Sequence, residues 1–160
     1  MIVDLTPWEY EHACAVGIGR FTANWGNQDA PHYKSELMED NRTAQVASAI
    51  CELAVAKATN RYWSGHVWHK SDHNKYRDLP DVGNNIEVRR VRNGNSIAVR
   101  KHQLLKGLIL FAAKAVEPEF TQVNVWGFID YDKAWELGVP AIYAPETTRL
   151  VHKTHLKTEW

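Results

Sequence analysis

The pattern of apolar and polar residues predicts helices in the first third of the chain and strands in the remainder. In Thr6-Pro7-Trp8-Glu9, the threonine can cap a helix, the proline fits its first position, and the glutamate can reach back to the capping amide. We expect this helix to extend to about Arg20. The stretch 21–35 contains glycine, asparagine, aspartate and proline, and it predicts a loop.

A second helix is predicted from Arg42 to Thr59. This segment is rich in alanine and places apolar residues around several sides, which is typical of a largely buried helix. Glu52 is its only charged residue between Arg42 and Lys57. Because an isolated buried carboxylate is costly, we expect Glu52 to have a partner.

The middle of the chain predicts a loop and then a hairpin. Residues 63–79 are polar and aromatic, and we interpret them as an irregular loop with a short strand near His66–Trp68. The segments Ile86–Arg92 and Ser96–Lys101 flank Asn93-Gly94-Asn95, a favourable hairpin turn.

The last third predicts further strands. Gly107–Val116 fits either one helical face or a buried strand, and we favour the strand. Phe120–Ile129 alternates as a strand does. Asp132 is the expected cap of a short helix that stops at Gly138, and Arg149–Leu156 is expected to be a last strand or an extended tail.

These elements predict an α/β (α+β) fold, in which N-terminal helices flank a mostly antiparallel or mixed sheet. No repeat, low-complexity tract or linker divides the chain, so we expect a single domain over 1–160. Within it, 1–35 would be the N-terminal helix and loop and 42–156 the core.

Composition excludes several classes of protein. The chain has 160 residues, with 44% hydrophobic and 24% charged residues, which is typical of a globular domain and excludes disordered, collagen-like and coiled-coil chains. The longest nearly uncharged stretch, 43–56, is too short and too polar to span a bilayer, and we expect neither a secretory signal nor a membrane partner. Two cysteines, Cys14 and Cys51, make no disulfide framework, so a cytoplasmic location is expected.

The net charge of zero conceals an asymmetry. Residues 1–52 hold eight acids and three bases, whereas 86–106 holds one acid and six bases. A local basic patch of this kind could bind a phosphate backbone, although a solvated basic hairpin would have the same composition. The candidate nucleic-acid contacts are Arg90, Arg92, Arg100 and Lys101.

The run Pro80-Asp81-Val82-Gly83-Asn84-Asn85-Ile86-Glu87-Val88-Arg89 carries the most chemical information. Side chains alternate along a strand, so Glu87 and Arg89 should share a face. A three-residue loop over 83–85 would pair Val82 with Ile86 and place Asp81 opposite Glu87. A two-residue loop would send Asp81 to the other face.

Two adjacent carboxylates repel one another unless a positive charge separates them. A divalent cation such as Mg²⁺ or Mn²⁺ does this, polarises a phosphoryl oxygen and lowers the pKa of a bound water. Asp81 and Glu87 are therefore candidate metal ligands, and Glu52 is a third. Arg89 would point toward a phosphate, but it stays protonated and cannot act as a base.

In order and type, these residues resemble the PD-(D/E)XK nuclease superfamily, and more narrowly a group of small bacteriophage-encoded proteins of that fold. The matching segments are Cys51-Glu52-Leu53-Ala54-Val55-Ala56-Lys57, Asp81–Arg89 and Trp126-Gly127-Phe128-Ile129-Asp130. The resemblance implies a restriction-endonuclease-like core and a metal-dependent nuclease that cleaves nucleic acid, with DNA as the expected partner.

The resemblance also implies residue roles. Asp81 and Glu87 would bind the metal, and Glu52 would be a further ligand or orienting acid. Arg89 occupies the position of the superfamily's lysine, which puts catalysis in doubt; Lys101 is an alternative source of an amine. The alternative function is a catalytically impaired module that binds nucleic acid or a host protein without cleavage. The sequence leaves open whether the chain forms a homodimer.

A weaker hypothesis is a zinc site. His66, His69 and His73 have a spacing that could supply three imidazole ligands, although loop histidines that face solvent have the same pattern.

Overall fold

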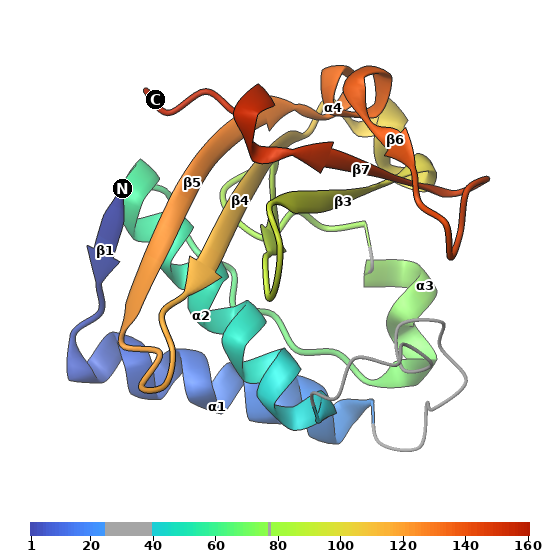
Figure 1. Cartoon of the computed structure of the whole chain (residues 1–160). Helices are drawn as coiled ribbons and strands as arrows, with labels where there is room; N and C mark the ends of the chain where they lie inside the picture. The colour runs from blue at the N-terminus through green and yellow to red at the C-terminus, as the bar shows by residue number, and fades with distance from the viewer. Residues whose placement is uncertain (25–39, 77) are drawn as a thin grey trace.

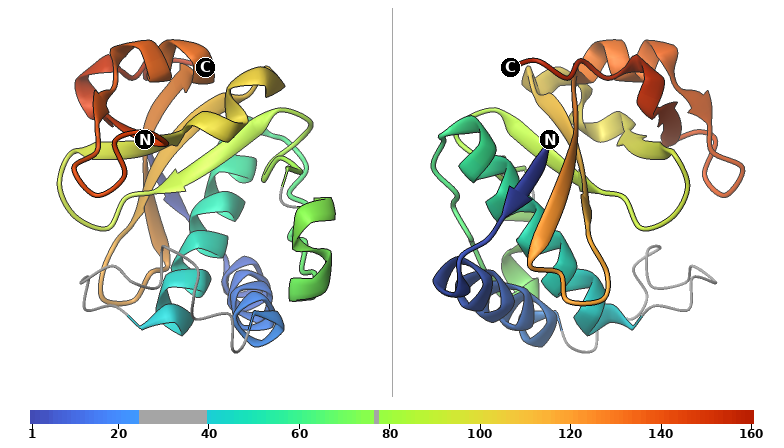
Figure 2. Two further views of the ribbon diagram at one scale, coloured as in Figure 1. Left: turned by 90° about the vertical axis from the view of Figure 1, so that its right-hand side faces the viewer. Right: turned by 60° about the vertical axis from the view of Figure 1, so that its left-hand side comes forward.

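The computed structural model describes residues 1–24, 40–76 and 78–160, and it is a mixed α/β fold with three layers. Two long helices cover one face of a four-stranded sheet, and a three-stranded sheet with a short helix covers the other face (Figure 1). Both views in Figure 2 place the long helices and the three-stranded sheet on opposite sides of the central strands. None of the helices in the described ranges is long and apolar enough to cross a bilayer.

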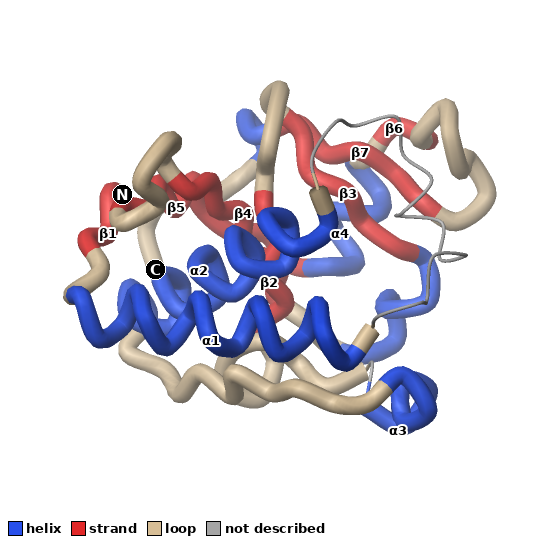
Figure 3. Tube along the Cα trace, turned by 90° about the horizontal axis from the view of Figure 1, so that it is seen from below, coloured by secondary structure: helices blue, strands red, loops and turns tan. Residues whose placement is uncertain are grey.

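The helical layer consists of α1 (Pro7–Ala23) and α2 (Asn41–Thr59). The predicted capping box begins α1: the Thr6 amide donates to the Glu9 carboxylate at 2.7 Å, and the Glu9 amide donates to the Thr6 hydroxyl at 3.3 Å. The two helices lie against one another (Figure 3). Gly17 permits the close approach, because a Cβ there would lie 2.4 Å from the Val46 Cα.

The four-stranded sheet is mixed, with strand order β1-β5-β4-β2. Its strands are β1 (Ile2–Asp4), β2 (Ile86–Arg90), β4 (Ile109–Ala115) and β5 (Gln122–Asp130). β2 is an edge strand that pairs with β4 in parallel, whereas the other pairs are antiparallel. Ile86 and Val88 of β2 face α2 in one core, so the alternate residues Glu87 and Arg89 face the other way.

The second sheet has the order β3-β7-β6 and is antiparallel. It consists of β3 (Ser96–Arg100), β6 (Val139–Pro140) and β7 (Thr148–His152), and it packs with α4 (Tyr131–Leu137) in a second core. The remaining short helices are η2 (Lys70–Asp72), α3 (His73–Tyr76), η3 (Lys101–Lys106) and η4 (Lys153–His155).

The predicted hairpin is wrong. Its two segments form β2 and β3, and Gly94 has the positive φ of 77° that a turn uses. However, β2 pairs with β4 and β3 pairs with β7, so the two segments belong to different sheets. The local turn signal was correct, but each strand pairs with a strand from a more distant part of the chain.

Other predictions had mixed outcomes. The strand interpretations of 107–116 and 120–129 are confirmed by β4 and β5, and the last segment supplies β7. No strand forms at His66–Trp68, and α4 begins two residues earlier than predicted, with Asp130 rather than Asp132 at its N-cap. Of the predicted loop 21–35, 21–23 continue α1 and 25–35 lie outside the described residues.

Candidate functional site

The turn before β2 has the geometry on which the candidate site depends. Val82 and Ile86 pair in antiparallel fashion, and each amide donates to the other's carbonyl at 3.1 Å. The loop between them therefore has three residues, and Gly83 supplies the positive φ of 59°. Asp81 lies at the free edge of β2, where its Oδ2 accepts a hydrogen bond of 2.8 Å from the Val88 amide.

Glu52 is buried and has the partner that its position in α2 required. Its two oxygens accept from the two terminal nitrogens of Arg20, at 2.6 and 2.9 Å. The indole Nε1 of Trp63 donates to Glu52 Oε2 at 3.0 Å. Both carboxylate oxygens are thus occupied, which makes Glu52 part of an ion pair between α1 and α2 in this structure.

Glu87 and Arg89 share a face of β2, as predicted, and form an ion pair of 2.7 Å. The other contacts of Arg89 are internal: Nε donates to the Ala98 carbonyl at 3.2 Å, and a terminal nitrogen donates to Gln103 Oε1 at 2.6 Å. The Tyr131 hydroxyl donates to the same oxygen at 2.7 Å. Arg89 therefore joins β2 to β3 and η3, and it does not point toward an external phosphate.

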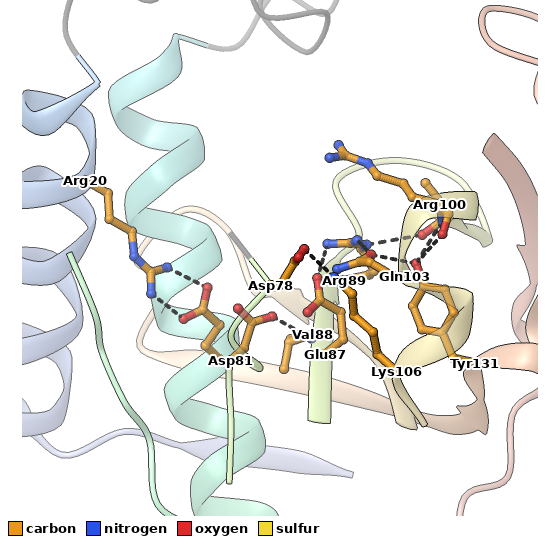
Figure 4. A network of polar contacts seen from close by, with 12 residues as sticks. Arg20, Asp78, Asp81, Glu87, Val88, Arg89, Arg100, Gln103, Lys106 and Tyr131 are labelled. Carbon is orange, nitrogen blue, oxygen red and sulfur yellow. Dashed lines mark hydrogen bonds and ion pairs between the residues drawn. The ribbon is translucent and has the colours of Figure 1, made fainter. Parts of the chain in front are cut away.

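Asp81 lies between these two ion pairs. Figure 4 shows its carboxylate between Arg20 on one side and Glu87 with Arg89 on the other. Burial, followed by repulsion from Glu87 and Glu52, raises the pKa of Asp81 well above its ordinary value, although the Val88 amide opposes the shift. The three acids predicted from the sequence therefore lie near one another, and Asp81 forms no ion pair with the described residues.

The arrangement has the electrostatics of a cation site, but it does not form a complete ligand cage. Within 1–24, 40–76 and 78–160, no group of three or more histidine, cysteine, aspartate or glutamate side chains is placed to hold a metal ion. Glu52 is also already paired, since its oxygens accept hydrogen bonds from Arg20 and Trp63. Asp81 and Glu87 lie close enough for their charges to repel one another.

Arg100 is an exposed cation near the acidic residues. It is exposed at the end of β3, and its guanidinium makes no ion pair or hydrogen bond within the described parts of the chain. Burial of part of the side chain and repulsion by Arg89 lower its pKa, and attraction to Glu87 opposes the shift. Arg100 thus lies close enough to Arg89 and Glu87 to feel both charges.

The other predicted nucleic-acid contacts are distributed over different parts of the fold, and only Lys101 is next to Arg100 in the chain. Arg90 alternates with Arg89 along β2, so it lies on the helix side of the sheet, where its charge acts on buried Cys51. Arg92 follows β2 in the connection to β3. Lys101 is exposed beside Arg100 and donates its amide to the Thr147 carbonyl at 2.9 Å.

The three histidines of the zinc hypothesis are not brought together as a metal group. His66 Nδ1 lies 2.7 Å from the Ser64 hydroxyl and its ring stacks on Trp68, with centroids 4.5 Å apart. His69 instead caps η2, and His73 is exposed. Burial and the nearby Arg20 charge lower the pKa of His66, so it lies beside the acidic site in neutral form.

Sequence reasoning missed the residues that hold the acids in place. Arg20 was used only as a helix end, and Gln103 and Tyr131 received no role at the site. The predicted need for a partner for Glu52 was a real signal, but the partner is 32 residues away in the chain. No local pattern identifies Gln103 or Tyr131, because they meet Arg89 only through the pairing of separate segments.

Comparisons with known proteins add no relative. No family model, no curated protein and no solved structure matches this chain. The functional argument therefore depends on the site itself.

Proposed function

We propose that this chain is a metal-dependent phosphodiesterase that hydrolyses nucleic acid, with DNA as the expected substrate, on a restriction-endonuclease-like core. The observation that carries the proposal is the position of Asp81. Its carboxylate is close to Glu52 and Glu87, its pKa is raised, and the nearest ion pairs neutralise the two glutamates and leave Asp81 without a cation.

The donor set fits Mg²⁺ or Mn²⁺ better than a softer metal. Mg²⁺ keeps several waters and commonly binds through only one or two carboxylates, so Asp81 and Glu87 are sufficient as protein ligands. A bound divalent ion would supply a polarised phosphoryl oxygen and a water of lowered pKa. Glu52 would hold Arg20 and shape the electrostatics around Asp81, a smaller role than direct ligation.

The arginines would have different tasks. Arg89 fixes the position of Glu87 through their 2.7 Å ion pair, and it cannot remove a proton from water. Arg100 would bind a phosphate, because its guanidinium is exposed and a phosphate would relieve its repulsion with Arg89. In this proposal Arg100 takes the phosphate contact that the sequence assigned to Arg89.

The proposal also includes the cellular compartment in which the reaction takes place. Both cysteines are free, as is usual in a reducing compartment. Together with the resemblance to small bacteriophage proteins, this supports activity in the cytoplasm of a host cell.

A second candidate function is a module of the same fold that binds nucleic acid without cleavage. The observation that favours it is the neutralisation of two of the three acids: Glu52 by Arg20 and Glu87 by Arg89. If these pairs persist when a divalent ion is present, Asp81 alone would hold the metal weakly. Cleavage by the wild-type protein separates the two candidates.

The test is cleavage of labelled linear and circular DNA, and of RNA, in Mn²⁺, in Mg²⁺ and in EDTA. Wild-type protein should cut in metal and not in EDTA. Glu87→Gln should abolish cutting with the fold intact, and exposed Glu136→Gln is the matched control that should cut normally. Binding without cutting under every condition would favour the non-catalytic module.

A further inference from the structure

An exposed turn of the second sheet has two large apolar residues at its centre. The connection from β6 to β7 projects from the sheet (Figure 1), and within it the Ala144 amide donates to the Ala141 carbonyl at 3.1 Å. Ile142 and Tyr143 are therefore the two central residues of a four-residue turn. Their exposed fractions are 99% and 73%.

This composition is unusual for a turn. Central turn positions are ordinarily occupied by glycine, proline, asparagine, aspartate or serine, because these residues suit the backbone and the solvent. Ile142 and Tyr143 do not belong to these residue types. The rest of the fold also buries neither side chain. Contact with a binding partner would explain why two large apolar side chains occupy exposed turn positions.

The turn is held rigidly. Ala141 donates to the Thr148 carbonyl at 3.0 Å, Thr148 donates to the Ala144 carbonyl at 2.9 Å, and Lys101 donates to the Thr147 carbonyl at 2.9 Å. The last bond ties the base of the turn to the residue that follows Arg100. A rigid apolar tip loses little conformational entropy when it binds.

Position connects this turn to the candidate site. The bond from the Lys101 amide to the Thr147 carbonyl places the base of the turn beside Arg100, and Arg100 lies within electrostatic range of Tyr143, Glu87 and Arg89. An aromatic ring beside an exposed arginine is the combination that binds single-stranded nucleic acid, because the ring stacks on a base and the cation binds the adjoining phosphate. Apolar side chains such as isoleucine also act as wedges between base steps.

A second copy of the chain is a poorer occupant. A stable protein interface needs about 800 Å² from each partner, or about 20–30 residues. The apolar tip consists of two residues, and the nearest other large apolar residue along the chain that is exposed is Val139 in β6. The turn therefore fits a single flat base better than a protein face.

We propose that the turn Ala141–Ala144 contacts unpaired or unstacked bases, with Ile142 and Tyr143 against the base and Arg100 on the adjacent phosphate. This inference rests on the proposed action on nucleic acid and adds to it the substrate class: single-stranded or locally opened nucleic acid in preference to regular duplex. It predicts a binding preference that can be measured without cleavage.

In the experiment, the protein is titrated in a calcium buffer into a single-stranded oligonucleotide that contains 2-aminopurine. The same titration is carried out with the duplex form of that oligonucleotide. Wild-type protein should bind the single strand more tightly and change the 2-aminopurine fluorescence. Tyr143→Ala should weaken single-strand binding about tenfold, as expected for loss of one stacking contact, and Ile142→Ser should reduce the preference for single strand. Tyr143→Phe should behave like wild type.

Trp8→Ala is the matched control, because Trp8 is an aromatic residue that is 81% exposed on α1. It should bind both probes as wild type does. Unchanged single-strand binding by Tyr143→Ala and Ile142→Ser would overturn the inference, as would a change only in oligomeric state measured by sedimentation velocity.

The outcomes for the two proposals are separate. If wild-type protein cleaves nucleic acid and Tyr143→Ala cleaves and binds equally well, only the role of the turn fails. If wild-type protein binds single strands through Tyr143 and never cleaves, the turn proposal stands and the phosphodiesterase proposal fails. If it does neither, both fail.

Discussion

Arg20 and Glu52 form a two-pronged ion pair between α1 and α2, with nitrogen–oxygen distances of 2.6 and 2.9 Å. The exposed fractions of the two side chains are 13% and 7%, so neither charge is well solvated. Removal of one partner would leave the other charge buried and unpaired, which is more costly than the pair itself is stabilising.

Arg20→Ala should therefore destabilise the protein by about 3–5 kcal/mol, measured as the free energy of unfolding in urea. In Arg20→Ala/Glu52→Gln the buried charge is absent, and much of the loss should be recovered. A single-mutant loss below about 1 kcal/mol would show that the pair behaves as a solvated surface pair.

Gly17 sets the distance between the helices that carry this pair. An added methyl group would lie 2.4 Å from the Val46 Cα, and backbone atoms cannot move aside cheaply. Gly17→Ala should cost at least about 1–3 kcal/mol in unfolding free energy, because the helices must separate. Gly19→Ala is the control: its methyl group would meet only the Val67 side chain at 3.4 Å, and the better helix propensity should leave stability equal or higher by up to about 1 kcal/mol.

Arg89 should matter for the fold as well as for the site. Its guanidinium binds Glu87, the Ala98 carbonyl and Gln103, and a lysine can reproduce only part of this set. Arg89→Lys should cost about 2–4 kcal/mol in thermal or urea unfolding, since buried partners lose their donors. Arg100→Lys, at an exposed arginine, should change stability by less than about 0.5 kcal/mol. Equal stability of the two variants would contradict the internal role of Arg89.

The raised pKa of Asp81 predicts how the stability of the protein depends on pH. Its pKa in the folded protein is above the ordinary value of 3.8, so the folded state holds this proton more tightly than the unfolded chain does. The contribution of Asp81 to stability is therefore lost as pH rises from about 4 through the folded pKa. Asp81→Asn, which mimics the protonated acid, should be more stable than wild type at neutral pH and lose this advantage below about pH 4.

Urea unfolding of wild type and Asp81→Asn across this pH range measures the difference directly. Addition of Mn²⁺ at neutral pH should stabilise wild-type protein and not Asp81→Asn. Parallel pH profiles of the two proteins would mean that Asp81 is solvated and carries an ordinary charge.

Local chemistry in the sequence was sufficient for the long helices and for several strands, but it left the length of the turn at the site open. The capping box at Thr6 and the alternation in 120–129 each depend on residues that are neighbours in the chain. The same alternation correctly placed Glu87 and Arg89 on one face. Period and turn chemistry act within a few residues, so a sequence can be interpreted for them directly.

Long-range pairing was the part that the sequence could not predict. The turn at Gly94 indicated a hairpin, but β2 pairs with β4 and β3 pairs with β7 in different sheets. The same limitation concealed the contact of Arg89 with Gln103 and the partner of Glu52. These contacts depend on how complete segments pack, and no spacing along the chain encodes them locally.

The most direct test of the central claim is an anomalous diffraction experiment on a crystal soaked in Mn²⁺. Our account predicts one manganese peak bound by the carboxylates of Asp81 and Glu87, with metal–oxygen distances of about 2.1–2.4 Å and waters in the remaining positions. The soaked Asp81→Asn crystal should lack the peak. A wild-type crystal without manganese at these two carboxylates, while Glu87 remains paired only with Arg89, would contradict the account.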